Sequence, residues 1–183
     1  EKPEGPATWA PASGISALVN QGEAVSPELQ IQKFGPDAGG LHWLIIYGLK
    51  GMAAYADHAL ILGKQDEGVY AFFHKALKRL AEEPMTADDL LGLALECGEV
   101  NLKIMGLLDA ANTEAYGNPV PTKVRVTPVK GHAILVSGHD LLDLEELLKQ
   151  TEGKGINIYT HGEMLPAHGY PGLKKYPHFA GNF

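Results

Sequence analysis

The chain lacks several features that would assign it to a common class of protein. It has one cysteine in 183 residues, Cys97, which excludes a disulfide framework and fits a reducing compartment. No apolar run reaches the ~18 residues that a membrane-spanning helix needs. The formal net charge is −7, and no cluster of basic residues offsets it, which argues against a nucleic-acid surface. We therefore predict a cytoplasmic protein that binds neither membranes nor nucleic acids.

The composition is that of a folded protein, with 45% hydrophobic and 20% charged residues. Residues 1–40 are rich in proline, glycine and alanine, and we predict an arm or linker there, with one short helical turn at 14–22. Residues 41–122 predict a helical bundle domain, and residues 123–183 predict the beginning of a truncated Rossmann-like α/β domain. Within the bundle we expect helices over 41–63, over 68–83 with a stop at Pro84, and from a capping box at Thr86 and Asp89 onward, followed by a loop over 112–122.

The last third of the chain predicts a strand–helix–strand unit, preceded by a further strand over 123–129. Two short β-branched runs, 133–136 and 156–159, flank a segment whose leucines recur with helical spacing. Asp140 is placed to cap the start of that helix. So short a crossover makes the two strands parallel. The fold class is therefore α+β: a helical bundle domain followed by the first βαβ unit of a Rossmann-like domain.

Two side chains of the metal-ligand type follow these strands. His139 comes after the first strand and Glu163 after the second. Because ligands gather beyond the carboxyl ends of parallel strands, both residues are placed to share one ligand, although 24 positions separate them. Taken singly, the histidine reads as a loop or capping residue and the glutamate as an ordinary exposed acid. Their convergence predicts part of a metal site.

The remaining histidines and the cysteine have plainer interpretations. His161 lies two positions before Glu163, so in a continuing strand it would point to the same side, as a proton donor or as a hydrogen-bond partner of a ligand. His168 and His178 read as loop, surface or supporting residues. Three further histidines lie on helical segments and read as structural, and Cys97 reads as a packed thiol; these histidines are His42, His58 and His74.

These same residues carry a resemblance to a known family. The segment from Ser137 to the end reads SGHDLLDLEELLKQTEGKGINIYTHGEMLPAHGYPGLKKYPHFAGNF. It resembles the hybrid cluster protein family, whose members are also called prismane proteins or hydroxylamine reductases. The resemblance implies an iron–sulfur oxidoreductase that reduces hydroxylamine to ammonia, with nitric oxide as a competing substrate and a protein as electron donor. It also implies that His139 and Glu163 bind iron in a hybrid iron–sulfur–oxygen cluster.

The chain departs from that family in its thiolates. The family holds a second iron–sulfur cluster and the rest of the hybrid cluster through several cysteines, whereas Cys97 matches no cluster ligand. Because an iron–sulfur cluster needs about four thiolates, we expect an internal fragment that holds neither cluster intact and is inactive alone. We also expect it to self-associate through uncovered apolar surface. A carbon monoxide dehydrogenase-like metalloenzyme is the runner-up, and a nucleotide-binding α/β module is a distant alternative because the G-x-G-x-x-G spacing is absent.

Overall fold

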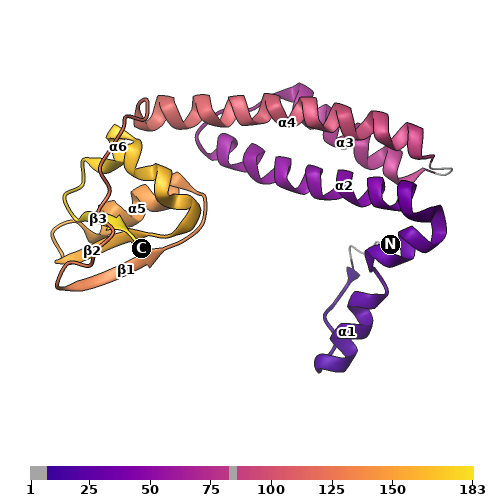
Figure 1. Cartoon of the computed structure of the whole chain (residues 1–183), viewed down its shortest axis with the longest axis horizontal. Coiled ribbons are helices and arrows are strands. Elements are labelled where there is room, and N and C mark those ends of the chain that lie inside the picture. The colour runs from indigo at the N-terminus through magenta and orange to yellow at the C-terminus, as the bar shows by residue number, and fades with distance from the viewer. Residues whose placement is uncertain (1–7, 83–85) are drawn as a thin grey trace. The chain divides into compact units, whose positions relative to one another are not determined.

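The computed structural model describes residues 8–82 and 86–183. Contacts divide this part of the chain into two compact units. One contains the described residues up to Lys50 together with Ala71–Glu99, and the other contains Gly51–Tyr70 and Val100–Phe183. None of the described helices is both long and apolar enough to cross a membrane. The elements are α1 (Ile15–Glu23), α2 (Pro27–Ile61), α3 (Glu67–Ala81), α4 (Ala87–Tyr116), β1 (His132–Val136), α5 (Leu141–Thr151), β2 (Ile156–Thr160), the 3₁₀ segment η2 (Gly162–Gly169), α6 (Pro171–Lys174) and β3 (Phe179–Asn182) (Figure 1).

The first unit is helical, and its helices α3 and α4 are joined by ion pairs as well as by apolar packing. Lys75 binds Glu96 at 2.5 Å, and Arg79 binds Asp89 at 3.1 Å. The predicted start of the helix after Thr86 is confirmed, since Thr86 Oγ1 accepts a hydrogen bond from the Asp89 amide at 3.2 Å. The buried side chains of this unit include Ile45, Leu49, Phe72, Ala76, Leu80, Leu90, Leu93 and Cys97.

The described part of residues 1–40 contains more helix than the single short turn that the sequence predicted. α1 spans nine residues, and α2 begins at Pro27 rather than at Leu41. Gly35 has φ 83° and ψ 167°, so it interrupts the helix, and Pro36 restarts it. These two residues therefore kink α2, in a segment where the sequence predicted an arm or linker. Residues 1–7 and the predicted stop at Pro84 lie outside the described residues.

The predicted loop over 112–122 is also wrong in its first part. α4 continues to Tyr116, although Asn112 and Thr113 are weak helix formers. Tyr116 is only 4% exposed and packs into the apolar core of the second unit. The burial of this large side chain outweighs the local preference for a loop.

Residues 123–183, which we call the α/β module, contain the predicted strand–helix–strand unit. β1 and β2 are parallel, with Val136 opposite Thr160, and β3 adds a third parallel strand beside β2. Helix α5 connects β1 to β2 and begins at the predicted cap, Asp140. The parallel βαβ arrangement is therefore confirmed, within a chain that is mostly helical.

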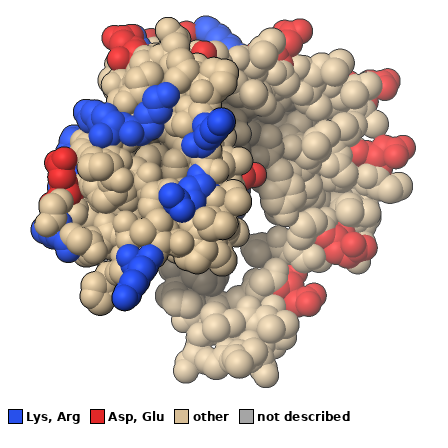
Figure 2. Space-filling model, turned by 60° about the vertical axis from the view of Figure 1, so that its left-hand side comes forward, with Lys and Arg blue, Asp and Glu red and all other residues tan. Residues whose placement is uncertain are grey.

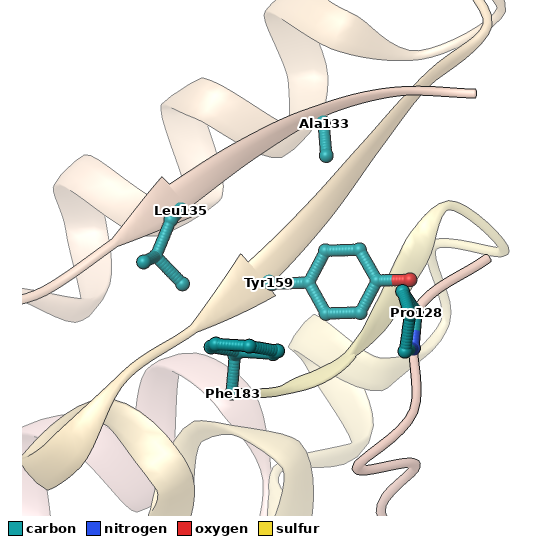
Figure 3. Close-up of a pocket in the computed structure, with 5 residues that line it drawn as sticks. All are labelled: Pro128, Ala133, Leu135, Tyr159 and Phe183. Atoms are coloured by element: carbon teal, nitrogen blue, oxygen red, sulfur yellow. The ribbon is translucent and has the colours of Figure 1, made fainter. Parts of the chain in front are cut away.

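The two faces of this sheet differ in their cover. On one face, the side chains of Ile134 and Ile158 point into the apolar core. Helix α5 covers this core with Leu144 and Leu148. The opposite face carries an apolar recess lined by Pro128, Ala133, Leu135, Tyr159 and Phe183 (Figure 3). Leu135 is 56% exposed and Phe183 is 70% exposed. Tyr159 on the same face is only 6% exposed. Parallel sheets are normally covered on both faces, so this face is an apolar surface that the described chain covers only in part.

The predicted strand over 123–129 is wrong, because this segment has no strand structure. It lies against the sheet through single hydrogen bonds: the Asn182 amide donates to the Arg125 carbonyl at 2.9 Å, and the Val129 amide donates to Tyr159 Oη at 2.7 Å. Proline at 128 removes a backbone donor. The alternating valines therefore belong to an irregular segment that is hydrogen-bonded to the sheet at two points.

The negative charge of the chain belongs to its helical part. Residues 123–183 carry seven lysines and arginines against six acids, and Figure 2 shows basic side chains gathered over the surface that this module contributes. A module near neutrality offers little electrostatic repulsion against association through its apolar sheet face. Self-association remains a prediction.

Candidate metal-binding pair at the carboxyl edge of the sheet

His139 is held between the end of β1 and the cap of α5. Gly138 has φ 130°, a conformation that favours glycine, and it redirects the chain after β1. The next residue but one, Asp140, caps α5: its Oδ1 accepts from the amides of Leu142 at 2.8 Å and Asp143 at 3.2 Å. The backbone on both sides of His139 is therefore fixed by local structure.

Glu163 is held by the equivalent turn after β2. The His161 amide donates to the Val136 carbonyl at 2.8 Å, which extends the β1–β2 hydrogen bonding by one residue. Gly162 then turns the chain with φ 56°, and η2 begins with Glu163 in its first turn. Both candidate ligands thus emerge one turn beyond adjacent parallel strands.

The structure brings the two predicted side chains into direct contact. His139 Nε2 meets Glu163 Oε2, and the side chains are 56% and 75% exposed. The geometric part of the prediction is confirmed, because the strands are parallel and both side chains leave at the same edge. A solvent-exposed pair of this kind stabilises a fold by at most about 1 kcal/mol, so its stability value alone does not explain the arrangement.

The donor set fits part of an iron site. Imidazole nitrogen and carboxylate oxygen are harder ligands than thiolate and suit an iron that also takes oxygen or nitrogen ligands. Two protein ligands alone make a weak site. Across residues 8–82 and 86–183, no group of three or more histidine, cysteine, aspartate or glutamate side chains is placed to hold a metal ion. His139 and Glu163 can therefore supply two ligands, and the others must come from elsewhere.

Cys97 does not supply such a ligand in this arrangement. It is 6% exposed in α4, and burial raises the pKa of its thiol. A raised pKa disfavours the thiolate, which is the form that binds metals. The interpretation of Cys97 as a packed thiol agrees with this environment.

The other histidines of the α/β module lie in three different environments. The strand ends at Thr160, so the alternation that would align His161 with Glu163 does not apply; His161 is exposed, and its supporting role stays a prediction. His168 is 5% exposed, which makes a surface location wrong. Its ring stacks on Phe179 at a centroid distance of 3.8 Å. His178 is half-buried and contacts Thr151 Oγ1 at 2.9 Å.

Sequence reasoning missed two polar residues at this edge, Thr160 and Asn182. They end β2 and β3, and Thr160 is fully buried. A polar residue at the end of an apolar strand was the available signal for Thr160. Asn182 could not be found in this way, because β3 itself was not predicted.

A recess opens beside His139, between the end of β1 and the first turns of α5. Its lining includes Ser137, Asp143, Leu147 and Met164. The recess gives a small molecule access to the imidazole. It does not suit a phosphate, because the Asp140 carboxylate already occupies the first amides of α5. This observation weighs against the nucleotide-binding alternative.

The fold and the pair define an α+β protein that presents a histidine and a carboxylate at the carboxyl edge of a parallel sheet. The sequence profile of the Prismane/CO dehydrogenase family matches residues 10–183. The chain belongs to this family.

Several relatives named hydroxylamine reductase are similar over almost the whole chain. The one from Syntrophobacter fumaroxidans is 59% identical over 181 residues, covering 97% of this chain and 32% of the relative. The one from Rhodospirillum rubrum is 59% identical over 179 residues, covering 98% and 33%. The one from Methanocella arvoryzae is 51% identical over 180 residues, covering 98% and 33%. The chain thus spans about a third of the length of these relatives.

Proposed function

We propose that this chain contributes His139 and Glu163 as two iron ligands to an oxidoreductase that reduces hydroxylamine to ammonia. The reaction takes up two electrons and two protons and releases water: NH₂OH + 2e⁻ + 2H⁺ → NH₃ + H₂O. The observation that carries the proposal is the contact between His139 and Glu163, which lie 24 positions apart and meet at one sheet edge. Family membership and the names of the relatives support the same reaction.

The whole protein would hold a hybrid iron–sulfur–oxygen cluster and a second iron–sulfur cluster. The hybrid cluster would supply an open iron position that acts as a Lewis acid and an electron source. This chain has one cysteine, so the thiolates come from the remaining two thirds of the relatives' length, and the chain alone is catalytically silent. Nitric oxide is a second substrate of the same site, and a carbon monoxide dehydrogenase-like reaction is the alternative within the family.

The proposal includes the partners and the setting of the reaction. A small-molecule substrate would enter beside His139, and an electron-donor protein would supply the two electrons. A cytoplasmic location is supported by the single reduced cysteine. Nucleic acids and membranes have no part in the proposed reaction, because the net charge of the chain is negative and its apolar runs are short.

We also propose that the three parallel strands begin a Rossmann-like domain. The division at residues 40 and 122 into an arm, a helical bundle domain and this α/β domain stays a prediction. Support comes from the parallel order β1-β2-β3 and from the connection through α5. In open sheets of this kind, ligands bind beyond the carboxyl ends of the strands, which is where the pair lies.

The test is substitution of the pair in the protein at the full length of its relatives. His139→Ala and Glu163→Gln should each remove iron from the hybrid cluster and abolish reduced-dye-dependent hydroxylamine reduction, with the second cluster retained. Removing a residue that supports a ligand typically lowers metal affinity or activity about 10- to 100-fold. Removing a ligand itself should lower them further. His132→Ala and Glu152→Gln are matched controls, because both residues are exposed in the same module.

Three results would contradict parts of the proposal. Full iron content and activity in both pair variants would show that the pair is not a ligand set. Carbon monoxide oxidation without hydroxylamine reduction would favour the alternative reaction. Hydroxylamine reduction by the 183-residue chain alone, near the full-length rate, would contradict the division of ligands.

A further inference from the structure

A buried polar cluster lies next to the turn that carries Glu163. Thr160 ends β2 and is fully buried, Asn182 ends β3, and His168 lies on η2 and is 5% exposed. Thr160 Oγ1 is 2.9 Å from His168 Nε2. The surrounding side chains include the buried apolar residues Met164 and Phe179. A hydroxyl and an imidazole in such a core must satisfy one another, because an unpaired buried polar group is costly.

The hydrogen bonds in this cluster have one consistent set of directions. The Asn182 amide, oriented to satisfy both of its ends, donates from nitrogen to Thr160 Oγ1 at 3.0 Å and accepts at oxygen from the Phe183 amide at 3.3 Å. Thr160 is then free to donate its hydroxyl hydrogen to His168 Nε2. The other ring nitrogen of His168 donates to the Gly181 carbonyl, and burial lowers the pKa of the imidazole. The cluster thus links the ends of β2 and β3 to a neutral histidine on η2.

The cluster anchors the turn on its inner side. η2 runs from Gly162 to Gly169, with Glu163 near its start and His168 near its end. At the start, the Met164 amide donates to the His161 carbonyl at 3.3 Å. At the end, the His168 ring is stacked on Phe179 with an interplanar angle of 9°. Between these anchors Glu163 is exposed, so its side chain depends on the backbone of η2 for its position opposite His139.

We propose that His168 is a positioning residue for the metal site: through Thr160 and Asn182 it fixes η2 and thereby aims the Glu163 carboxylate at the metal that Glu163 shares with His139. This inference rests on the proposed function, since it assumes that the pair binds iron. It adds three residues that do not touch the metal but hold one of its ligands. Replacing a residue that orients a ligand in this way typically lowers metal affinity about 10- to 100-fold.

The module contains a matched control for this cluster. Thr151 Oγ1 and His178 Nε2 form a second, partly buried threonine–histidine pair, also at 2.9 Å. Thr151 ends α5 and His178 precedes β3, so this pair lies at the amino-terminal edge of the sheet, away from Glu163. Thr151 Oγ1 donates to the Leu147 carbonyl at 2.7 Å, so it accepts from His178, and the direction of this bond is opposite to that in the Thr160 pair. Both pairs join a threonine to a histidine within the module, and only the Thr160 pair adjoins the ligand turn.

The first measurement uses the 183-residue chain without metal. Thr160→Val keeps the side-chain volume and removes the hydroxyl, whereas Thr160→Ser keeps the hydroxyl. We expect amide hydrogen exchange at His161 and Met164 to accelerate about tenfold in Thr160→Val and to stay within about twofold of the original in Thr160→Ser. Thr151→Val should leave these two amides unchanged. Equal exchange in all variants would overturn the anchoring role.

The second measurement uses the protein at the full length of its relatives. Thr160→Val and His168→Leu should lower iron affinity about 10- to 100-fold and alter the electron paramagnetic resonance spectrum of the remaining iron. Thr160→Ser should keep the original iron affinity and spectrum. Thr151→Val should also keep both, when it is compared with Thr160→Val at the same temperature interval below the melting temperature of each protein. If Glu163→Gln removes iron while Thr160→Val and His168→Leu keep the original affinity and spectrum, the positioning role alone is overturned. If Glu163→Gln also keeps its iron, the proposed function and the positioning role both fail.

Discussion

The cap of α5 offers a sharp test of how local structure supports the candidate site. Asp140 follows His139 directly and accepts two backbone hydrogen bonds through Oδ1, at 2.8 and 3.2 Å. Replacing such a cap by alanine costs about 1 kcal/mol, and losing a negative charge at a helix start adds about 0.3–1 kcal/mol. We therefore expect Asp140→Ala to destabilise α5 by about 1–2 kcal/mol. Asp140→Asn should lose only the charge contribution, because its side-chain oxygen still accepts both bonds.

The assay must report on α5 itself. Trp9 and Trp43 both lie outside the α/β module, so tryptophan fluorescence would follow the wrong part of the chain. Residue-resolved hydrogen exchange should show α5 amides exchanging about 5- to 30-fold faster in Asp140→Ala, which corresponds to the expected loss. Asp143→Ala is the control, since Asp143 lies in the same first turn, is exposed and caps nothing. Equal effects of Asp140→Ala and Asp143→Ala, or of Asp140→Ala and Asp140→Asn, would refute the capping argument.

Three further predictions test other parts of the chain. Leu135→Asp should reduce self-association, because Leu135 is 56% exposed on the partly covered apolar face of the sheet; sedimentation showing the same mass for both proteins would contradict this. Burial lowers the pKa of His168, so its neutral form is the folded form and stability should fall as the pH drops below its unfolded value of about 6.5. Hydrogen exchange within the α/β module, compared at about pH 7.5 and at about pH 5, should show this loss of stability. Measuring this module alone separates the effect of His168 from that of His42, whose pKa is also lowered by burial. His168→Gln should reduce the pH dependence of the stability. Cys97 is buried with a raised pKa, so it should react with a thiol reagent only after urea is added; rapid labelling of the folded chain would show that the thiol is accessible.

Elements with strong periodicity and clear ends were predictable from the residues alone. The leucine pattern, the cap at Asp140 and the two short β-branched runs together predicted the βαβ unit, and the structure confirms it. Because its two strands must be parallel, the unit also places His139 and Glu163 at one edge of the sheet. This part was predictable because it depends on local chemistry and on a crossover that has essentially one solution.

The errors came where distant contacts override local preference. The proline, glycine and alanine content of residues 1–40 predicted an arm or linker, but α2 begins at Pro27 and continues past Gly35 and Pro36 with a kink. Residues 112–116 suggested a loop, but the burial of Tyr116 in a core assembled from distant segments extends α4. No local pattern carries that information, because the atoms that bury Tyr116 lie dozens of residues away.

The sequence by itself determined the family, the βαβ unit and the two candidate ligands, since each depends on residue identity or on short-range spacing. Only the tertiary structure showed that His139 and Glu163 touch, that β3 joins the sheet beside β2, and that the described chain covers one face of the sheet only in part. It alone also revealed the cluster of Thr160, His168 and Asn182. The physical reason is that a buried hydrogen bond joins groups that only folding brings together. Those groups lie too far apart along the chain for local sequence preferences to predict their contact.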